Sequence, residues 1–327
     1  MALTLRRGRV SAVRERHEGL VRVEVDGVPC VVYPGLTGPV ALDDEVVVNV
    51  QARELGLGSG GFDVLYANLT RGLDLPPPDG AHVMKLPYTP LQFAAHHAEE
   101  EAPLTDLLAG MPVVCCSLHS QIAPVCAALA GLRVAYLQLP GGALPIALSD
   151  AVRDLRGREL FEAAVGVGEC FGGDVDCVNV WSALAWAGAA RFDAVVCAIG
   201  PGIVGTGTRL GHGGMAAAQA LTAATQLGGS PIVALRLSEA DSRPRHRGLS
   251  HHIDAILSLR GLSITVPWPA GCPVGEAPAG ADVIDVSGWR EACAGLPLSH
   301  MGRGPGDDPW FFAAAFAAGV AAKRRVR

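Results

Sequence analysis

The chain has 327 residues, of which 50% are hydrophobic, 18% are charged and only 5% are aromatic, and its net charge is −6 at pH 7. This length holds one large domain or two ordinary ones, and the composition supplies a substantial core of mainly aliphatic side chains. The acidic balance argues against nucleic acid as the main partner. The 41 glycines and 23 prolines predict many tight loops.

The nine cysteines and the apolar segments indicate the cellular compartment of the protein. The cysteine number is odd and no C-x-x-C pair occurs, so we expect reduced, buried thiols and no structural zinc site. The opening arginines Arg6, Arg7 and Arg9 precede a strand-like alternation, so we expect no signal peptide. Trp310–Ala322 is too short to cross a bilayer and predicts a core helix. We therefore expect a cytoplasmic protein with no membrane partner, and the sequence leaves a homo-oligomer open.

Residues 1–70 show the pattern of a small β-barrel. Asp26-Gly27 is a hairpin signal between short valine-rich segments. The segments that predict strands are Arg9–Val13, Val21–Val25, Cys30–Tyr33, Glu45–Val50 and Phe62–Leu69. The glycine-rich stretch Leu57–Gly61 predicts a flexible joint before the last of them. Residues 71–109, with prolines and an acidic run, are interpreted as a connecting segment.

Residues 110–327 alternate between apolar runs and helical segments. The expected strands are Val113–Cys116, Val134–Gln138, Ala164–Val167, Ala194–Ile199, Ile232–Leu237 and Ile264–Val266. The expected helices are Ile122–Leu129, Ala147–Leu155, Cys177–Ala187, Gly214–Leu227, Ser250–Leu257 and Gly288–Ala294. Ser250 is a good N-cap for the helix that begins there. Near-continuous apolar strands alternating with helices predict a mainly parallel, doubly wound α/β sheet. The fold class is therefore α/β, with a small N-terminal β-barrel.

Ligands of such sheets bind at the carboxyl ends of the strands. Five of the expected strands are followed by small or polar residues, which predicts a ligand site on that edge. The densest of these segments is Ser242–His252, directly after Asp241. It carries Arg243, Arg245 and Arg247 together with His246, His251 and His252. Permanent positive charge beside histidines that titrate near neutrality is typical of a site for an anion, a metal or a proton transfer.

The stretch Gly200–Gly205 matches G-x-G-x-x-G between an expected strand and an expected helix. Glycines there let backbone N–H groups approach a phosphate, and nearby hydroxyls add donors. The predicted anion-binding residues are Gly200, Gly202, Gly205, Thr206, Gly207, Thr208, Arg243, Arg245 and Arg303. The next strand is too far along the chain for a dinucleotide fingerprint, which argues against NAD or FAD. The cofactor is unknown, and a purely structural glycine turn is the alternative.

Several residues are candidates for acid–base chemistry. His246 or His251 would exchange the proton, with Asp174 as the group that orients a histidine. His119 and His300 are further candidates on the same edge. Asp174 or Asp176 would alternatively be a helix N-cap. A metal held by His246, His251, His252 and Asp241 is another reading, although neither H-x-x-x-H nor H-E-x-x-H occurs.

Together these motifs resemble a bacterial protein family with a domain of unknown function, number 3866. The residues that carry the resemblance are Leu55–Gly61, Leu118–Ser120, Gly141–Pro145, Phe171–Asp174, Gly200–Thr208 and Arg245–His252. The likeness covers nearly the whole chain. It implies no particular activity, substrate or catalytic residue.

The leading functional hypothesis is an enzyme acting on a small anionic metabolite, phosphorylated or nucleotide-like, through histidine acid–base chemistry. The first alternative is a non-catalytic ligand-binding or assembly protein. The second is a metal-dependent hydrolase. Metal analysis distinguishes the last from the others, and a turnover screen distinguishes enzyme from binding protein.

Overall fold

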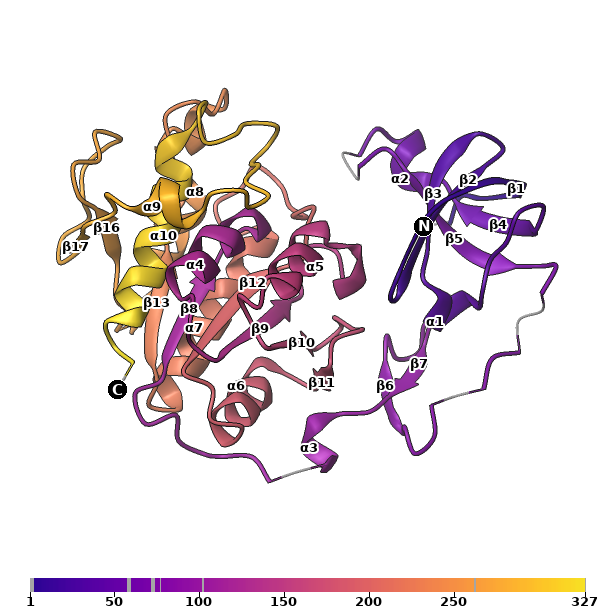
Figure 1. Cartoon of the computed structure of the whole chain (residues 1–327), viewed down its shortest axis with the longest axis horizontal. Helices are drawn as coiled ribbons and strands as arrows, with labels where there is room; N and C mark the ends of the chain where they lie inside the picture. Colours follow the sequence, from indigo (N-terminus) through magenta and orange to yellow (C-terminus); the bar gives the residue numbers. More distant parts are fainter. Residues whose placement is uncertain are drawn as a thin grey trace. The chain divides into compact units, whose positions relative to one another are not determined.

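The computed structural model describes residues 3–57, 60–71, 74–76, 78–101, 103–261 and 263–326 (Figure 1). The chain divides into two compact units, residues 1–96 and residues 97–327. Gly58 and Ser59 of the predicted joint lie outside the described residues.

The first unit contains a closed five-stranded barrel, which confirms the predicted architecture. Its strands, in the order β1-β2-β3-β5-β4, are β1 (Leu5–His17), β2 (Leu20–Val25), β3 (Val28–Val32), β5 (Asp63–Asn68) and β4 (Glu45–Asn49). Valines at alternate positions, such as Val21, Val23 and Val25, fill its interior because successive side chains of a strand point to opposite faces. The unit also contains α1 (Pro34–Thr37), α2 (Gln51–Glu54) and the hairpin of β6 (Val83–Lys85) and β7 (Phe93–Ala95).

The Asp26-Gly27 hairpin forms as predicted. Both residues have positive φ angles, 50° and 80°. This is the backbone of a type I′ turn, whose twist matches that of the flanking strands. The turn joins β2 to β3 and so sets the register of this strand pair.

The second unit is built on a six-stranded parallel sheet. Its strand order is β11 (Val175–Cys177), β10 (Ala163–Val167), β9 (Val134–Leu139), β12 (Ala194–Ile199), β8 (Pro112–Cys116), β13 (Ser230–Ala234). Along β8, Val114 and Cys116 join one core, whereas Val113 and Cys115 join the other. Both faces of the sheet are therefore buried, as continuous apolar strands predict.

Helices cover both faces of this sheet (Figure 1). Side chains of α4 (Ile122–Ala128), α5 (Asp150–Gly157), α9 (Trp289–Ala292) and α10 (Pro309–Lys323) belong to the first core. Side chains of α3 (Ala98–Glu101), α6 (Val180–Ala189), α7 (Ala216–Gln226) and α8 (His251–Leu257) belong to the second. The doubly wound α/β prediction is confirmed. Across the described ranges, no helix combines the length and the apolarity that a membrane span requires.

The predicted strand Ile232–Leu237 is wrong in its second half. β13 ends at Ala234, and β14 (Leu237–Ser238) pairs instead with β15 (Gly248–Leu249). The amide of Gln121 donates to the carbonyls of Ala234 and Leu235, at 3.1 and 2.9 Å. A side chain thus satisfies carbonyls at the end of β13, and the chain is free to turn.

Two other predicted elements are displaced. Of Ile264–Val266 only Thr265 bridges to β13, and the strand that follows is β16 (Pro267–Pro269), paired with β17 (Asp282–Ile284). Proline has no N–H with which to extend the ladder beside β13. The helix predicted from Cys177 begins at Val180 instead, because Asn179 caps it with bonds from Trp181 and Ser182.

Gly319 provides a test of the contact between α10 and α4. A Cβ at this position would lie 2.5 Å from the carbonyl oxygen of Val125, whereas a Cβ at Gly157 of α5 would meet nothing within 4 Å. We expect Gly319→Ala to lower the free energy of unfolding by about 1–3 kcal/mol through overpacking. The matched Gly157→Ala should leave it unchanged or raise it by up to about 1 kcal/mol. Urea unfolding followed by circular dichroism measures both, and equal stabilities would contradict the packing.

Candidate functional site

Loops from several strand ends meet at the carboxyl edge of the six-stranded sheet. A Cβ at Gly142 would lie 2.1 Å from the carbonyl oxygen of Gly200, and a Cβ at Gly213 would lie 1.9 Å from that of Gly141. The loops after β9 and β12 therefore pack backbone against backbone. Glycine is required at these positions because no side chain fits between the loops.

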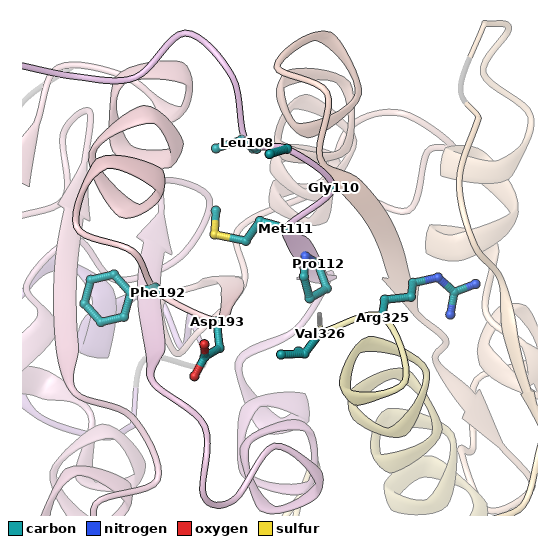
Figure 2. A pocket seen from close by; sticks show the side chains of 9 residues that line it. Leu108, Gly110, Met111, Pro112, Phe192, Asp193, Arg325 and Val326 are labelled. Carbon is teal, nitrogen blue, oxygen red and sulfur yellow. The ribbon is translucent and has the colours of Figure 1, made fainter.

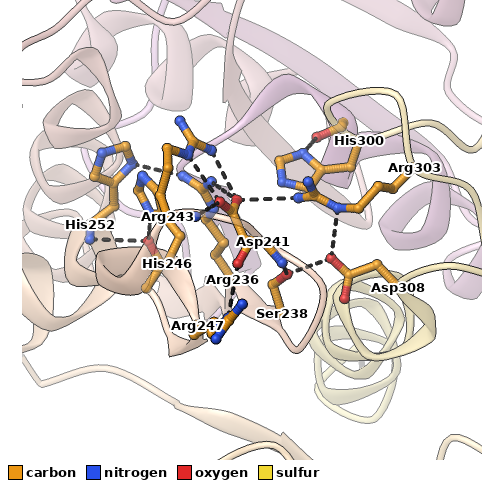
Figure 3. Close-up of polar contacts among 12 residues, drawn as sticks. Arg236, Ser238, Asp241, Arg243, His246, Arg247, His252, His300, Arg303 and Asp308 are labelled. Atoms are coloured by element: carbon orange, nitrogen blue, oxygen red, sulfur yellow. Dashed lines mark hydrogen bonds and ion pairs between the residues drawn. The ribbon is translucent and has the colours of Figure 1, made fainter.

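The centre of the site is a buried carboxylate that three arginines share (Figure 3). Asp241 is 1% exposed and lies 2.9 Å from Arg243, 3.2 Å from Arg303 and 3.3 Å from Arg236, itself 2% exposed. Burial raises the pKa of the Asp241 carboxyl, but the hydrogen bonds and charge of Arg243 and the charge of Arg236 lower it well below its usual range. Asp241 is therefore an anion at neutral pH.

A second buried carboxylate extends this arrangement. Asp308 accepts a hydrogen bond from Nε of Arg303 at 3.3 Å and another from the hydroxyl of Ser238. We call Arg236, Asp241, Arg243, Arg303 and Asp308 the arginine–aspartate cluster. Three guanidinium groups meet two carboxylates there, which leaves one net positive charge.

Three imidazoles lie beside this cluster, and we call His246, His251 and His252 the histidine cluster. Their ring centroids are 4.4–4.9 Å apart. Each offers one nitrogen within 4.8 Å of the nitrogens of the other two. Ser250 positions two of them, because its hydroxyl caps α8 at the amide of His252 and lies 2.7 Å from Nδ1 of His246. The predicted N-cap at Ser250 is confirmed.

The imidazoles of the histidine cluster are neutral at pH 7. Burial, and then the positive charges of Arg236 and Arg243, lower the pKa of His246 to about 3. Burial, followed by the charge of Arg245, also lowers the pKa of His251. Arg236 fixes the proton of His252, because a guanidinium only donates: Nη1 lies 3.3 Å from Nδ1, so the proton of His252 is on Nε2.

His119 and His300 lie at the same edge with structural partners. Nδ1 of His119 donates to the carbonyl of Ile199 at 3.1 Å, and Nε2 accepts from the hydroxyl of Ser149 at 2.6 Å. His119 thereby ties together the chain after β8, β9 and β12. Burial lowers the pKa of His119 to about 4 and that of His300 to about 3. The His300 ring stacks on Phe311 at 3.8 Å, and its Nδ1 lies 3.2 Å from the hydroxyl of Ser120.

The glycine-rich loop folds back on itself. The amide of Thr206 donates to Gly211 at 2.7 Å, the amide of Thr208 donates to the hydroxyl of Thr206 at 3.2 Å, and the two threonine hydroxyls are 2.7 Å apart. Two of the donors that the predicted anion site needs are thus engaged inside the loop. Gly205 bridges to His212, and a Cβ at Gly207 would lie 3.9 Å from Nη1 of Arg245, so the loop lies against the Ser242–His252 segment.

The prediction that Asp174 orients a histidine is wrong. Its carboxylate pairs with Arg156 and accepts from the amide of Ala164 at the beginning of β10, which is the amino edge of the sheet. The chain after β10 returns to that edge before it forms β11, so Asp174 lies away from the histidines. Neither Asp174 nor Asp176 caps α6, because Asn179 does.

Two cavities also lie at the amino edge. One, of about 540 Å³, is lined by Leu132, Arg133, Arg156, Phe161 and Asp174 among others. The other, of about 160 Å³, is shown in Figure 2 and is lined by Met111, Pro112, Phe192, Asp193 and Arg325 among others. Of the predicted site residues, only Asp174 lines either cavity.

The predicted metal ligand Asp241 does not fit that role. Its two oxygens accept from three guanidinium groups, which leaves no lone pair directed at a cation. The imidazoles of the histidine cluster do have the spacing of potential ligands. A metal site at this edge would therefore consist of histidines alone among the predicted residues.

Sequence reasoning missed three residues of the site. His212 stacks on His252 with the ring centroids 3.7 Å apart, and Arg236 and Asp308 complete the arginine–aspartate cluster. Arg236 could have been found, since a charged residue inside an apolar run is buried only with a partner. His212 had no comparable signal, because its contact depends on how the glycine-rich loop folds back.

Comparison with known families shows to which family the chain belongs. A family described as "Protein of unknown function (DUF3866)" matches residues 30–276. The chain belongs to this family. The DUF3866 match covers the glycine-rich loop, Asp241 and the histidine cluster, whereas His300, Arg303 and Asp308 follow it. Searches of curated proteins and of solved structures give no match.

The two predicted aspartates should differ strongly in their effect on stability. Asp241→Asn leaves three buried or half-buried guanidinium groups with one carboxylate, so we expect the free energy of unfolding to fall by about 3–5 kcal/mol. Asp174→Asn affects a partly exposed pair and should cost about 1 kcal/mol or less. Denaturant titration compares them. A small loss in Asp241→Asn would mean that its ion pairs do not hold the site together.

His119 and His300 predict a pH dependence of stability. Their folded pKa values, about 4 and about 3, lie below the ordinary value of 6.5, so the unfolded chain binds their protons first as the pH falls. The free energy of unfolding should therefore decrease from pH 7 to pH 5, by up to about 1.4 kcal/mol per pH unit for each histidine below 6.5. In the double variant His119→Gln/His300→Asn the slope should become shallower. A slope equal to that of the wild type would contradict the assignment.

Proposed function

We propose that this protein is an enzyme that acts on a small anionic metabolite at the carboxyl edge of its six-stranded sheet. The observation that carries the proposal is the net positive charge of the arginine–aspartate cluster beside neutral imidazoles. Buried positive charge in excess of its carboxylate partners is expected to attract an anion. Neutral imidazoles have lone pairs with which to accept a proton or hold a metal ion.

Exposed arginines supply the contact for the anionic group. Arg245 is exposed, lies against Gly207 and forms no ion pair with any part of the chain that the structure describes. Arg209, in the glycine-rich loop, is likewise exposed and unpaired within those residues. A guanidinium binds carboxylate or phosphate through two parallel hydrogen bonds. The substrate class is therefore a phosphorylated, nucleotide-like or carboxylate metabolite.

The histidine cluster supplies the reactive groups of the proposed enzyme. His246 or His251 exchanges a proton with the bound metabolite, or the cluster does so through a bound ion. When no ion is bound, His252, as a neutral Nε2 donor, suits a substrate oxygen that gains negative charge in the reaction. All nine cysteines are free thiols. We accordingly propose the cytoplasm as the compartment, since thiols persist there.

Anion binding is tested first, by isothermal titration calorimetry with inorganic phosphate, pyrophosphate and citrate. We expect at least one of them to bind, and Arg245→Gln to weaken its affinity about tenfold or more, because a charged hydrogen bond contributes about 1.5–3 kcal/mol. Arg191→Gln is the matched control. Arg191 is exposed, forms no ion pair with the described residues and precedes β12 at the opposite edge of the sheet. Equal loss in both variants, or no binding of any anion, would argue against the site.

Turnover is tested next, with mixtures of phosphorylated and carboxylate metabolites followed by phosphorus and proton NMR. We expect the wild type to convert at least one compound and His251→Asn to lose that conversion while keeping its circular dichroism spectrum. Binding without any conversion would favour the alternative of a non-catalytic ligand-binding protein.

A further inference from the structure

One imidazole of the histidine cluster has a buried nitrogen that lacks a partner. Nε2 of His251 is inaccessible to solvent and forms no hydrogen bond with any described residue. Buried polar atoms are almost always paired, so an orphan of this kind points to a water or an ion. The ring of His251 lies within 4.8 Å of His246 and 4.4 Å of His252, so whatever satisfies this nitrogen is in reach of all three rings.

The contact that holds the neighbouring His246 is typical of a metal-binding histidine. Its Nδ1 lies 2.7 Å from the hydroxyl of Ser250, which is itself fixed as the N-cap of α8. When Nδ1 donates to that oxygen, Nε2 keeps a free lone pair. Ligating histidines usually donate their second N–H to an oxygen in this way, which fixes the ring and its tautomer.

From this geometry we propose that His246, His251 and His252 bind a divalent transition-metal ion of the zinc class. Neutral imidazoles are preferred ligands of Zn²⁺ and Co²⁺. The three nitrogens, now within 4.8 Å of one another, would close to about 3.4 Å around a tetrahedral ion with bonds of about 2.0–2.1 Å.

The contact between Arg236 and His252 disfavours binding of the ion, and this predicts a specific effect of replacing Arg236. It donates to Nδ1 of His252, which places the proton of His252 on Nε2. Binding through Nε2 moves the remaining proton to Nδ1, where it faces a donor, so the contact with Arg236 has to break. A residue that accepts at this position should therefore bind the ion more tightly than the wild type does.

The surroundings also indicate what completes the coordination. Three protein ligands leave the fourth position of such an ion open, as in catalytic zinc sites. Arg243 belongs to the arginine–aspartate cluster and Arg245 directly precedes His246 in the chain, so positive charge lies beside the three rings. The fourth ligand is then an anion or a water. This assignment of the fourth position rests on the proposed function, whereas binding of the ion does not.

The test uses the full chain, stripped with a chelator and titrated with ZnCl2 by calorimetry and with CoCl2 by visible absorption. We expect one equivalent of either ion per chain and the d–d bands of four-coordinate Co²⁺ with nitrogen ligands. His251→Asn should weaken the affinity at least tenfold, and it removes no hydrogen bond of Nε2 from the described structure. His246→Asn keeps a polar atom near Ser250 and should give the same loss. The control His17→Asn, in the barrel, should bind like the wild type.

Arg236→Gln is a further test, made on protein whose circular dichroism spectrum matches that of the wild type, because its amide oxygen accepts from Nδ1–H of His252. We expect its affinity for Zn²⁺ to exceed that of the wild type. Absence of stoichiometric binding to the wild-type protein overturns the proposal. So does a thiolate-to-Co²⁺ charge-transfer band, which would place the ion on cysteines, or binding that the histidine variants leave unchanged. Metal binding without metabolite turnover would contradict the proposed function alone, and turnover by a protein that binds no stoichiometric metal ion would contradict the metal site alone.

Discussion

The buried carboxylate of Asp241 is the constraint on which the rest of the site depends. A charge taken out of water is costly unless it is paired and hydrogen-bonded, and Asp241 meets that condition only when three arginines from different stretches of chain reach it. Arg236 stands where β13 gives way to β14, Arg243 lies two residues beyond Asp241, and Arg303 precedes α10. Their convergence therefore fixes three loops at once.

This constraint also explains the state of the histidines. The guanidinium groups that satisfy Asp241 lie close enough to His246 to disfavour a second positive charge, and burial acts in the same direction. Two carboxylates cannot neutralise three arginines, so the edge retains positive charge while its imidazoles retain their lone pairs. Attraction for an anion and availability of nitrogen ligands thus arise from the same set of contacts.

Sequence patterns predicted the elements whose partners are close along the chain or are set by burial. The alternating valines of the barrel and the continuous apolar runs of the sheet belong to this class, as do the Asp26-Gly27 turn and the Ser250 cap. The failures involve contacts between distant residues. β13 ends early because the side-chain amide of Gln121 donates to the carbonyls of Ala234 and Leu235. The position of Asp174 was predicted wrongly because the three-residue strand β11 has no sequence pattern that would indicate it. The Ser242–His252 segment was recognised by its charge, but the positions of His212, Arg236 and Asp308 around it depend on tertiary packing.

The long chain separation within the arginine–aspartate cluster has a consequence for synthesis. Asp241 and Arg303 are 62 positions apart, and Asp308 comes later still. Chains emerge from the ribosome at about 5–20 residues per second. For several seconds a nascent chain therefore contains all six strands of the parallel sheet while Asp241 lacks one of its three cations and the Arg303–Asp308 pair does not exist. The edge that carries the histidines is therefore completed only near the end of synthesis, and premature termination between the two positions would leave it without Arg303 and Asp308.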